Sequence, residues 1–262
     1  MEVVAMDRRI TLHLIQGDCL EVLHKMSTDS VDIVLTSPPY NMGKIVKYSK
    51  RENSSRYDIG YKDNLKKEEY YEFLWRFIND SLRVAKKYVF LNIQPLSNNK
   101  EVVYRIIGDF SKYIKDIVIW HKTRYPYPIQ KNTLATAYEF IIIFDKNNPD
   151  KRSFGDIEDL KGLPNVWVGE PNDALYKEKF HYKNLGAIFP IWLPRKIIST
   201  FTKEYDTVLD PFLGSGSTML ACLELNRNCI GIEKNPEFIE VCKRRLNWGS
   251  CFKKVNWIFE KR

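Results

Sequence analysis

The chain has 262 residues, of which 44% are hydrophobic and 28% are charged, as in folded domains with a core of their own. This composition excludes a disordered or collagen-like chain, and no apolar stretch approaches the roughly 18 residues that a membrane span requires. The 41 basic and 33 acidic residues give a net charge of +8, which favours a polyanionic partner such as a nucleic acid without excluding a basic enzyme that has none.

The cysteines and the first residues narrow the class further. The five cysteines are an odd number and form no C-x-x-C pair, which argues against a disulfide framework and against a zinc site. Residues 1–9 contain no apolar stretch long enough for a signal peptide. We therefore expect a cytoplasmic protein with no membrane contact.

The elements predicted in chain order alternate between strands and helices. Strands are predicted at residues 10–16, 31–36, 88–93, 117–120, 140–144, 207–209 and 228–232. Helices are predicted at residues 19–26, 65–86, 100–110, 193–201, 218–225 and 236–246. This alternation predicts an α/β fold with a doubly wound, mostly parallel sheet. In such sheets, ligands bind beyond the carboxyl ends of the strands.

Two stretches show no sustained periodicity. Residues 41–64 are polar, with six basic and three acidic side chains, and are predicted to form a long loop. Residues 147–185 contain three prolines and are predicted to form an inserted, irregular lobe.

Glycines separate the strand at residues 207–209 from the helix that follows it. The connecting sequence is Asp210-Pro211-Phe212-Leu213-Gly214-Ser215-Gly216-Ser217-Thr218, and its G-x-G step lets the backbone approach a ligand closely. The next helix offers free N–H groups to a carboxylate or phosphate. A G-x-G step alone, however, favours a helix entry in which the glycines serve packing.

An acidic residue follows this loop at the distance that nucleoside sites use. Glu233 comes about 20 residues later, where acidic side chains typically bind ribose hydroxyls. The dinucleotide fingerprint and the P-loop are both incomplete, because position 219 is Met and no Lys follows the glycines. Asp210 suits an amine cation and Asp18 suits an adenine amino group, so the ligand that fits is S-adenosylmethionine. Asp18 is equally consistent with a helix N-cap.

The strand at residues 31–36 runs directly into Ser37-Pro38-Pro39-Tyr40. The two prolines end the hydrogen-bonding ladder and form a rigid turn. The Ser37 hydroxyl and the Pro38 carbonyl are two acceptors that suit an exocyclic amino group, and the Tyr40 ring can stack on the base that carries it. The motif alone is equally consistent with a structural diproline turn, but together with the glycine-rich loop it favours a site.

The two motifs, in this order, resemble those of the beta-type, permuted amino-methylating DNA methyltransferases of restriction-modification systems. The resemblance covers most of the chain and implies a Rossmann-like methyltransferase sheet with S-adenosylmethionine as cofactor. It implies catalytic roles for Ser37, Pro38, Pro39 and Tyr40. It implies cofactor-binding roles for Asp18, Asp210, Phe212, Gly214, Ser215, Gly216, Thr218 and Glu233. The family's His-Pro segment is reduced here to Phe189-Pro190, which we also expect beside the cofactor.

The residue before the prolines bears on the target base. Members of the family with Ser at this position more often resemble cytosine-N4 enzymes, so Ser37 favours cytosine N4, with adenine N6 as the alternative. We expect a flipped base and direct methyl transfer, with no metal and no covalent intermediate. An RNA or protein-amide methyltransferase and a nucleotide-binding module without catalysis are less favoured.

The expected partner is double-stranded DNA. Basic residues of the 41–64 loop and of the basic-aromatic stretch 121–127 are predicted to contact it, namely Lys44, Lys47, Lys50, Arg51, Arg56, Lys122 and Arg124. The lobe at residues 147–185 is predicted to recognise the target sequence, with 1–146 and 186–262 forming the catalytic domain. A cognate restriction endonuclease is a candidate partner, and both a monomer and a homodimer remain open.

Overall fold

A computed structural model describes residues 9–42, 64–125, 131–155, 157, 160, 162–171, 188–249 and 255–262, with the backbone alone at 247–249. Its strands are β1 (Ile10–Gln16), β2 (Val31–Thr36), β3 (Ala85–Ile93), β4 (Ile114–Lys122), β5 (Tyr138–Asp145), β6 (Val166–Gly169), β7 (Thr207–Asp210), β8 (Asn228–Glu233) and β9 (Val255–Lys261). Its helices are α1 (Cys19–Lys25), α2 (Lys67–Val84), α3 (Lys100–Asp109), α5 (Trp192–Phe201), α6 (Ser217–Glu224) and α7 (Pro236–Gly249), with a short 3-10 helix at Ser111–Tyr113.

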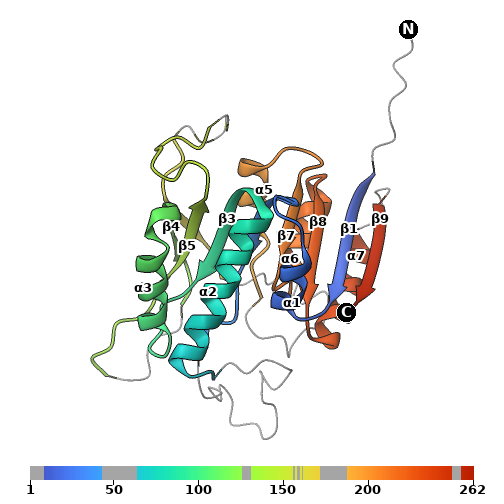
Figure 1. Cartoon of the computed structure of the whole chain (residues 1–262). Helices are drawn as coiled ribbons and strands as arrows, with labels where there is room; N and C mark the ends of the chain where they lie inside the picture. The colour runs from blue at the N-terminus through green and yellow to red at the C-terminus, as the bar shows by residue number, and fades with distance from the viewer. Residues whose placement is uncertain are drawn as a thin grey trace, which may run out of the picture.

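The described strands form one sheet in the order β6-β4-β5-β3-β2-β7-β8-β1-β9 (Figure 1). Only β5 runs against its neighbours, β3 and β4, and the other described pairs are all parallel. The predicted mostly parallel α/β sheet is therefore confirmed. The predicted elements are all present, with ends shifted by at most three residues.

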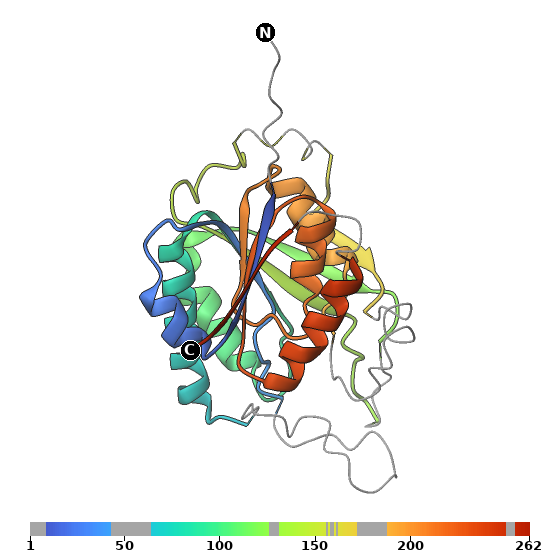
Figure 2. The ribbon, with the colours of Figure 1, turned by 90° about the vertical axis from the view of Figure 1, so that its right-hand side faces the viewer.

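Helices cover both faces of the sheet (Figure 2). The buried side chains of α1, α2 and α3 form one apolar cluster with one face, and those of α5, α6 and α7 form a second cluster with the other. Strands covered on both faces must be apolar on both, which is why Ile33, Val34 and Leu35 of β2 are all fully buried. None of the helices in the described part of the chain has the length and apolarity that a bilayer crossing needs.

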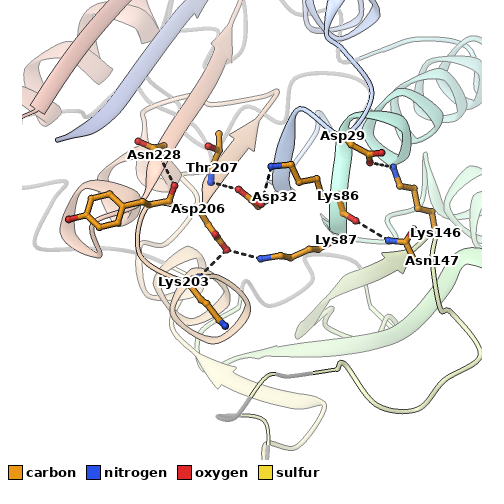
Figure 3. A network of polar contacts seen from close by, with 11 residues as sticks. Asp29, Asp32, Lys86, Lys87, Lys146, Asn147, Lys203, Asp206, Thr207 and Asn228 are labelled. Carbon is orange, nitrogen blue, oxygen red and sulfur yellow. Dashed lines mark hydrogen bonds and ion pairs between the residues drawn. The ribbon is translucent and has the colours of Figure 1, made fainter. Parts of the chain in front are cut away.

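Polar contacts join the starts of the central parallel strands (Figure 3). Asp32 accepts a hydrogen bond from the Thr207 backbone N–H at 2.8 Å and pairs with Lys86 at 3.3 Å. Beside it, Asp206 accepts from the Lys87 ammonium at 2.8 Å. These contacts tie β2, β3 and β7 together at one edge, so the opposite edge holds their carboxyl ends and both sequence motifs.

Two strands go beyond the sequence prediction. β6 lies within residues 147–185, where an irregular lobe is predicted, but it pairs with β4 and buries Trp167 in the core. The prediction of no regular structure is wrong for these four residues, because so short a strand has no readable period. β9 pairs with β1 at the far edge of the sheet. Residues 172–185 of the lobe lie outside the described residues.

Candidate active site

The two motifs meet at the carboxyl ends of β2 and β7. These strands are paired in parallel, with Ile33 opposite Val208 and Val34 opposite Leu209. At their ends, the Thr36 hydroxyl donates to the Asp210 carboxylate at 2.6 Å. The turn Ser37-Pro38-Pro39-Tyr40 and the glycine-rich loop therefore leave the sheet side by side.

The glycine-rich loop adopts backbone conformations that favour glycine. Gly214 and Gly216 have φ angles of 54° and 86°. A Cβ atom on Gly216 would lie 2.6 Å from the Cys242 Sγ of α7, so an added side chain would clash as well as strain the backbone. The Gly214 N–H donates to the Glu233 carboxylate at 2.9 Å, and the same carboxylate accepts from the Asn235 N–H at 2.7 Å. Glu233 thus fastens the loop to the end of β8.

A buried arginine supports this loop from the side of α7. Arg245 is 1% exposed, and its Nη1 donates to the Ser215 carbonyl at 2.6 Å and to the Ser215 hydroxyl at 2.7 Å. It also donates to the Ser217 hydroxyl at 3.3 Å. The sequence analysis misses Arg245, because nothing in an amphipathic helix rich in Lys and Arg distinguishes the one that turns inward.

Asp210 is a buried carboxyl with a perturbed pKa. Burial raises the pKa of Asp210 from 3.8 to about 6, although hydrogen bonds from Thr218, Thr36 and the Phe212 N–H lower it. A cation beside Asp210 would favour the ionised form, so this chemistry fits the amine of S-adenosylmethionine. The Phe212 ring itself packs edge-on against Phe77 of α2, at 5.1 Å between ring centres.

The remaining predicted cofactor residues also lie at this edge. Asp18 caps α1 by accepting from the Leu20 N–H at 3.0 Å, and it pairs with Lys234 just after β8 at 3.1 Å. The cap is therefore present, and the adenine contact of Asp18 stays a prediction. Phe189 packs on the core, and the Pro190 carbonyl accepts from the Leu193 N–H at the start of α5.

The Ser-Pro-Pro-Tyr turn is held by two side chains that the sequence analysis does not single out. The Tyr70 hydroxyl of α2 donates to the Pro39 carbonyl at 2.7 Å, and the Asn99 amide donates to the Tyr40 carbonyl at 2.5 Å. No described residue donates to the Pro38 carbonyl. The turn therefore keeps as a ligand acceptor the one carbonyl that the sequence analysis selects.

Tyr40 is fixed through its hydroxyl. This hydroxyl lies 2.9 Å from the Ser37 hydroxyl, donates to the Glu139 carboxylate at 2.7 Å and accepts from the Asn92 amide at 3.2 Å. Burial, and then the charge of Glu139, raise the pKa of Tyr40 well above its usual value. Tyr40 therefore keeps its proton. The signal for Asn92 and Glu139 is a polar residue inside or directly before an otherwise apolar strand.

The predicted DNA-binding residues fall into three groups. Lys44, Lys47, Lys50, Arg51 and Arg56 lie outside the described residues. Arg124 is exposed and lies 3.5 Å from Glu170, so it remains a candidate. Lys122 has a buried side chain whose ammonium lies 2.5 Å from Glu139. Burial in an ion pair removes Lys122 from the surface that DNA phosphates reach, which contradicts its predicted role.

Comparison with known proteins agrees with this geometry. The family model described as DNA methylase, of the N6 and N4 methyltransferases, matches residues 31–244. The chain belongs to this family. With its two motifs, it is an S-adenosylmethionine-dependent DNA methyltransferase that acts on an exocyclic amino group.

Individual relatives resemble this methyltransferase over most of their length. The Type II methyltransferase M.HpaI of Haemophilus parainfluenzae is 29% identical over 259 residues, which cover 92% of this chain and 75% of the relative. The fold resembles that of the PvuII DNA methyltransferase (cytosine-N4-specific), with a TM-score of 0.68, 21% identity and coverage of 90% and 87%. It also resembles a DNA modification methylase of Thermus thermophilus, TTHA0409, solved with S-adenosyl-L-methionine, with a TM-score of 0.61, 20% identity and coverage of 95% and 98%.

Proposed function

We propose that this methyltransferase modifies cytosine N4 at a specific sequence in double-stranded DNA, with adenine N6 as the alternative. The observation that carries the proposal is the hydrogen bond between Thr36 and Asp210, which brings the amine acceptors beside the glycine-rich loop. The family includes enzymes for both bases, and Ser37 in place of Asp or Asn favours cytosine.

The residues of the turn have defined roles in this proposal. The Ser37 hydroxyl and the Pro38 carbonyl accept hydrogen bonds from the two N–H groups of the target amine. These bonds draw the nitrogen toward tetrahedral geometry and stabilise the positive charge that grows on it. The Tyr40 ring stacks on the flipped base, which offsets part of the unstacking cost of a few kcal/mol.

The other motif supplies the second binding partner. Asp210 is placed to hold the amine of S-adenosylmethionine, and the loop from Phe212 to Thr218 is placed to hold its carboxylate. Glu233 is placed to hold the ribose, and Asp18, Phe189 and Pro190 are placed around the adenine. When bound, S-adenosylmethionine provides an electrophilic methyl group, so the chain itself needs only to orient the amine and keep the reacting centre dry.

Nucleoside mass spectrometry tests the proposal. The purified enzyme is incubated with unmethylated genomic DNA and S-adenosylmethionine, and the digested DNA is analysed. We expect N4-methylcytosine from the wild type and none from Ser37→Ala. Production of N6-methyladenine would overturn the choice of base, and the absence of both methylated nucleosides would overturn the proposed function.

A restriction endonuclease with the same recognition sequence is part of the proposal, as is a location in the cytoplasm, where bacterial DNA lies. Its support is the resemblance to relatives that are named Type II methyltransferases. DNA methylated by this enzyme should then resist cleavage by that nuclease, whereas DNA treated with Ser37→Ala should be cut.

A further inference from the structure

A charged cluster lies directly behind the Ser-Pro-Pro-Tyr turn. Glu139, at the start of β5, is 7% exposed and accepts from donors on three other segments. The Lys122 ammonium at the end of β4 lies 2.5 Å from Oε1, while the Asn92 amide of β3 and the Tyr40 hydroxyl each lie 2.7 Å from Oε2. Because β5 is antiparallel to β3 and β4, its first residues lie at the edge where β3 and β4 end.

These contacts decide which way each hydroxyl donates. An ionised carboxylate only accepts hydrogen bonds, and a hydroxyl has one proton to donate. Tyr40 gives its proton to Glu139, so the contact of 2.9 Å between Tyr40 and Ser37 must be donated by Ser37. The Ser37 proton therefore faces the protein, and its lone pairs face outward.

We propose that the Lys122–Glu139 ion pair is the positioning element that makes Ser37 an acceptor for the target amine. This inference rests on the proposed function, but it holds for cytosine N4 and for adenine N6 alike. Lys122 keeps Glu139 ionised, Glu139 orients Tyr40, and Tyr40 orients Ser37. No proton moves along this series, because each bond only fixes direction and transmits the negative potential of the carboxylate to the amine as it becomes positive.

A second buried ion pair provides a matched control. Lys115 and Asp145 join the same two strands, β4 and β5, at their other ends, with side chains 1% and 6% exposed and 3.5 Å apart. Removing either carboxylate leaves a buried cation without its partner, so both substitutions should destabilise the fold. Only the Glu139 substitution should reverse the hydrogen bonds at Ser37.

The test uses Glu139→Gln, with Asp145→Asn as the control. In the Glu139→Gln variant, Lys122 holds the new amide oxygen, so the amide NH₂ group donates to Tyr40, and Tyr40 then donates to Ser37. The methyl transfer rate in a single turnover should fall on the order of 100-fold, the scale measured for loss of one preorganised group. The affinity for S-adenosylmethionine should stay within twofold of wild type, and Asp145→Asn should transfer methyl at the wild-type rate.

A Tyr40→Phe background separates positioning from structural support. If Glu139 acts only through Tyr40, Glu139→Gln should cause no further loss of rate in that background. Equal loss in both backgrounds, an equal loss in Asp145→Asn, or a wild-type rate in Glu139→Gln would each overturn the inference.

A spectroscopic readout keeps this test apart from the proposed function. Tyrosine labelled at Cζ reports donation by the Tyr40 hydroxyl in NMR, and the Tyr40→Phe spectrum assigns the signal. Glu139→Gln should shift that signal, whereas Asp145→Asn should not. Were the wild type to methylate no DNA, the proposed function would fail, and the unchanged or shifted Tyr40 signal would still decide whether Glu139 sets the direction of the bond.

Discussion

At the scale of single residues, Asp210 makes the unliganded enzyme sensitive to pH. Its pKa is about 6 in the folded state against 3.8 for an ordinary aspartate, and burial is the main cause. Between these values the folded chain binds more protons than the unfolded chain, so stability falls as the pH rises from about 4 to about 6. A pKa difference of this size corresponds to on the order of 3 kcal/mol. Asp210→Asn should remove this loss, as urea denaturation at a series of pH values would show.

The same residue should link cofactor binding to pH in the opposite direction. A bound amine cation favours ionised Asp210, so the dissociation constant of S-adenosylmethionine should fall as the pH rises through about 6 and then level off. Calorimetry of Asp210→Asn should show weaker binding with a flat profile. Asp80→Asn on α2 serves as a control, and a wild-type profile as flat as that of Asp210→Asn would contradict the role of this carboxylate.

At the scale of elements, the contact between α6 and α7 fixes the glycine-rich loop. Gly216 precedes α6 with φ of 86°, and a Cβ atom there would meet Cys242. Gly216→Ala should therefore lose about 1–2 kcal/mol from left-handed strain alone, with the clash in addition. Thermal unfolding should show a lower Tm, and S-adenosylmethionine should bind more weakly because the loop and the start of α6 must shift.

A second glycine controls for the added methyl group. Gly108 lies in α3, and a Cβ atom there would meet nothing within 4 Å. Gly108→Ala should raise stability by about 0.5–1 kcal/mol, the usual gain in a helix, and leave cofactor affinity unchanged. Similar behaviour of the two variants would show that the conformation of Gly216 does not matter.

The elements also show where sequence reasoning succeeds. Both motifs follow apolar strands, so their positions at strand ends could be predicted, but the pairing of β2 with β7 depends on the order of strands, which no local pattern encodes. Lys122 illustrates the other limit. A lysine at a strand end suits a DNA contact, and only the antiparallel β5 reveals that Glu139 neutralises it. Arg245 turns inward for the same kind of non-local reason.

At the scale of the whole molecule, the two edges of the sheet carry different loads. Where the parallel strands begin, acidic and basic side chains pair with one another, as between Asp206 and Lys87 (Figure 3). At the carboxyl ends lie both motifs and, directly after Tyr40, the segment with six basic and three acidic residues. We therefore expect DNA to bind across the carboxyl ends, with the basic segment contributing to the attraction.

The salt dependence of DNA binding tests this division. Each lost phosphate contact lowers the slope of log affinity against log salt by about 0.9, so Lys44→Gln combined with Lys47→Gln should lower it by about 1.8. The matched pair is Lys25→Gln with Lys203→Gln, two exposed lysines near the starts of β2 and β7. Because both double variants remove the same net charge, fluorescence anisotropy over a salt series separates direct contact from overall attraction. Equal slopes for the two would mean that DNA does not approach the edge that holds the two motifs.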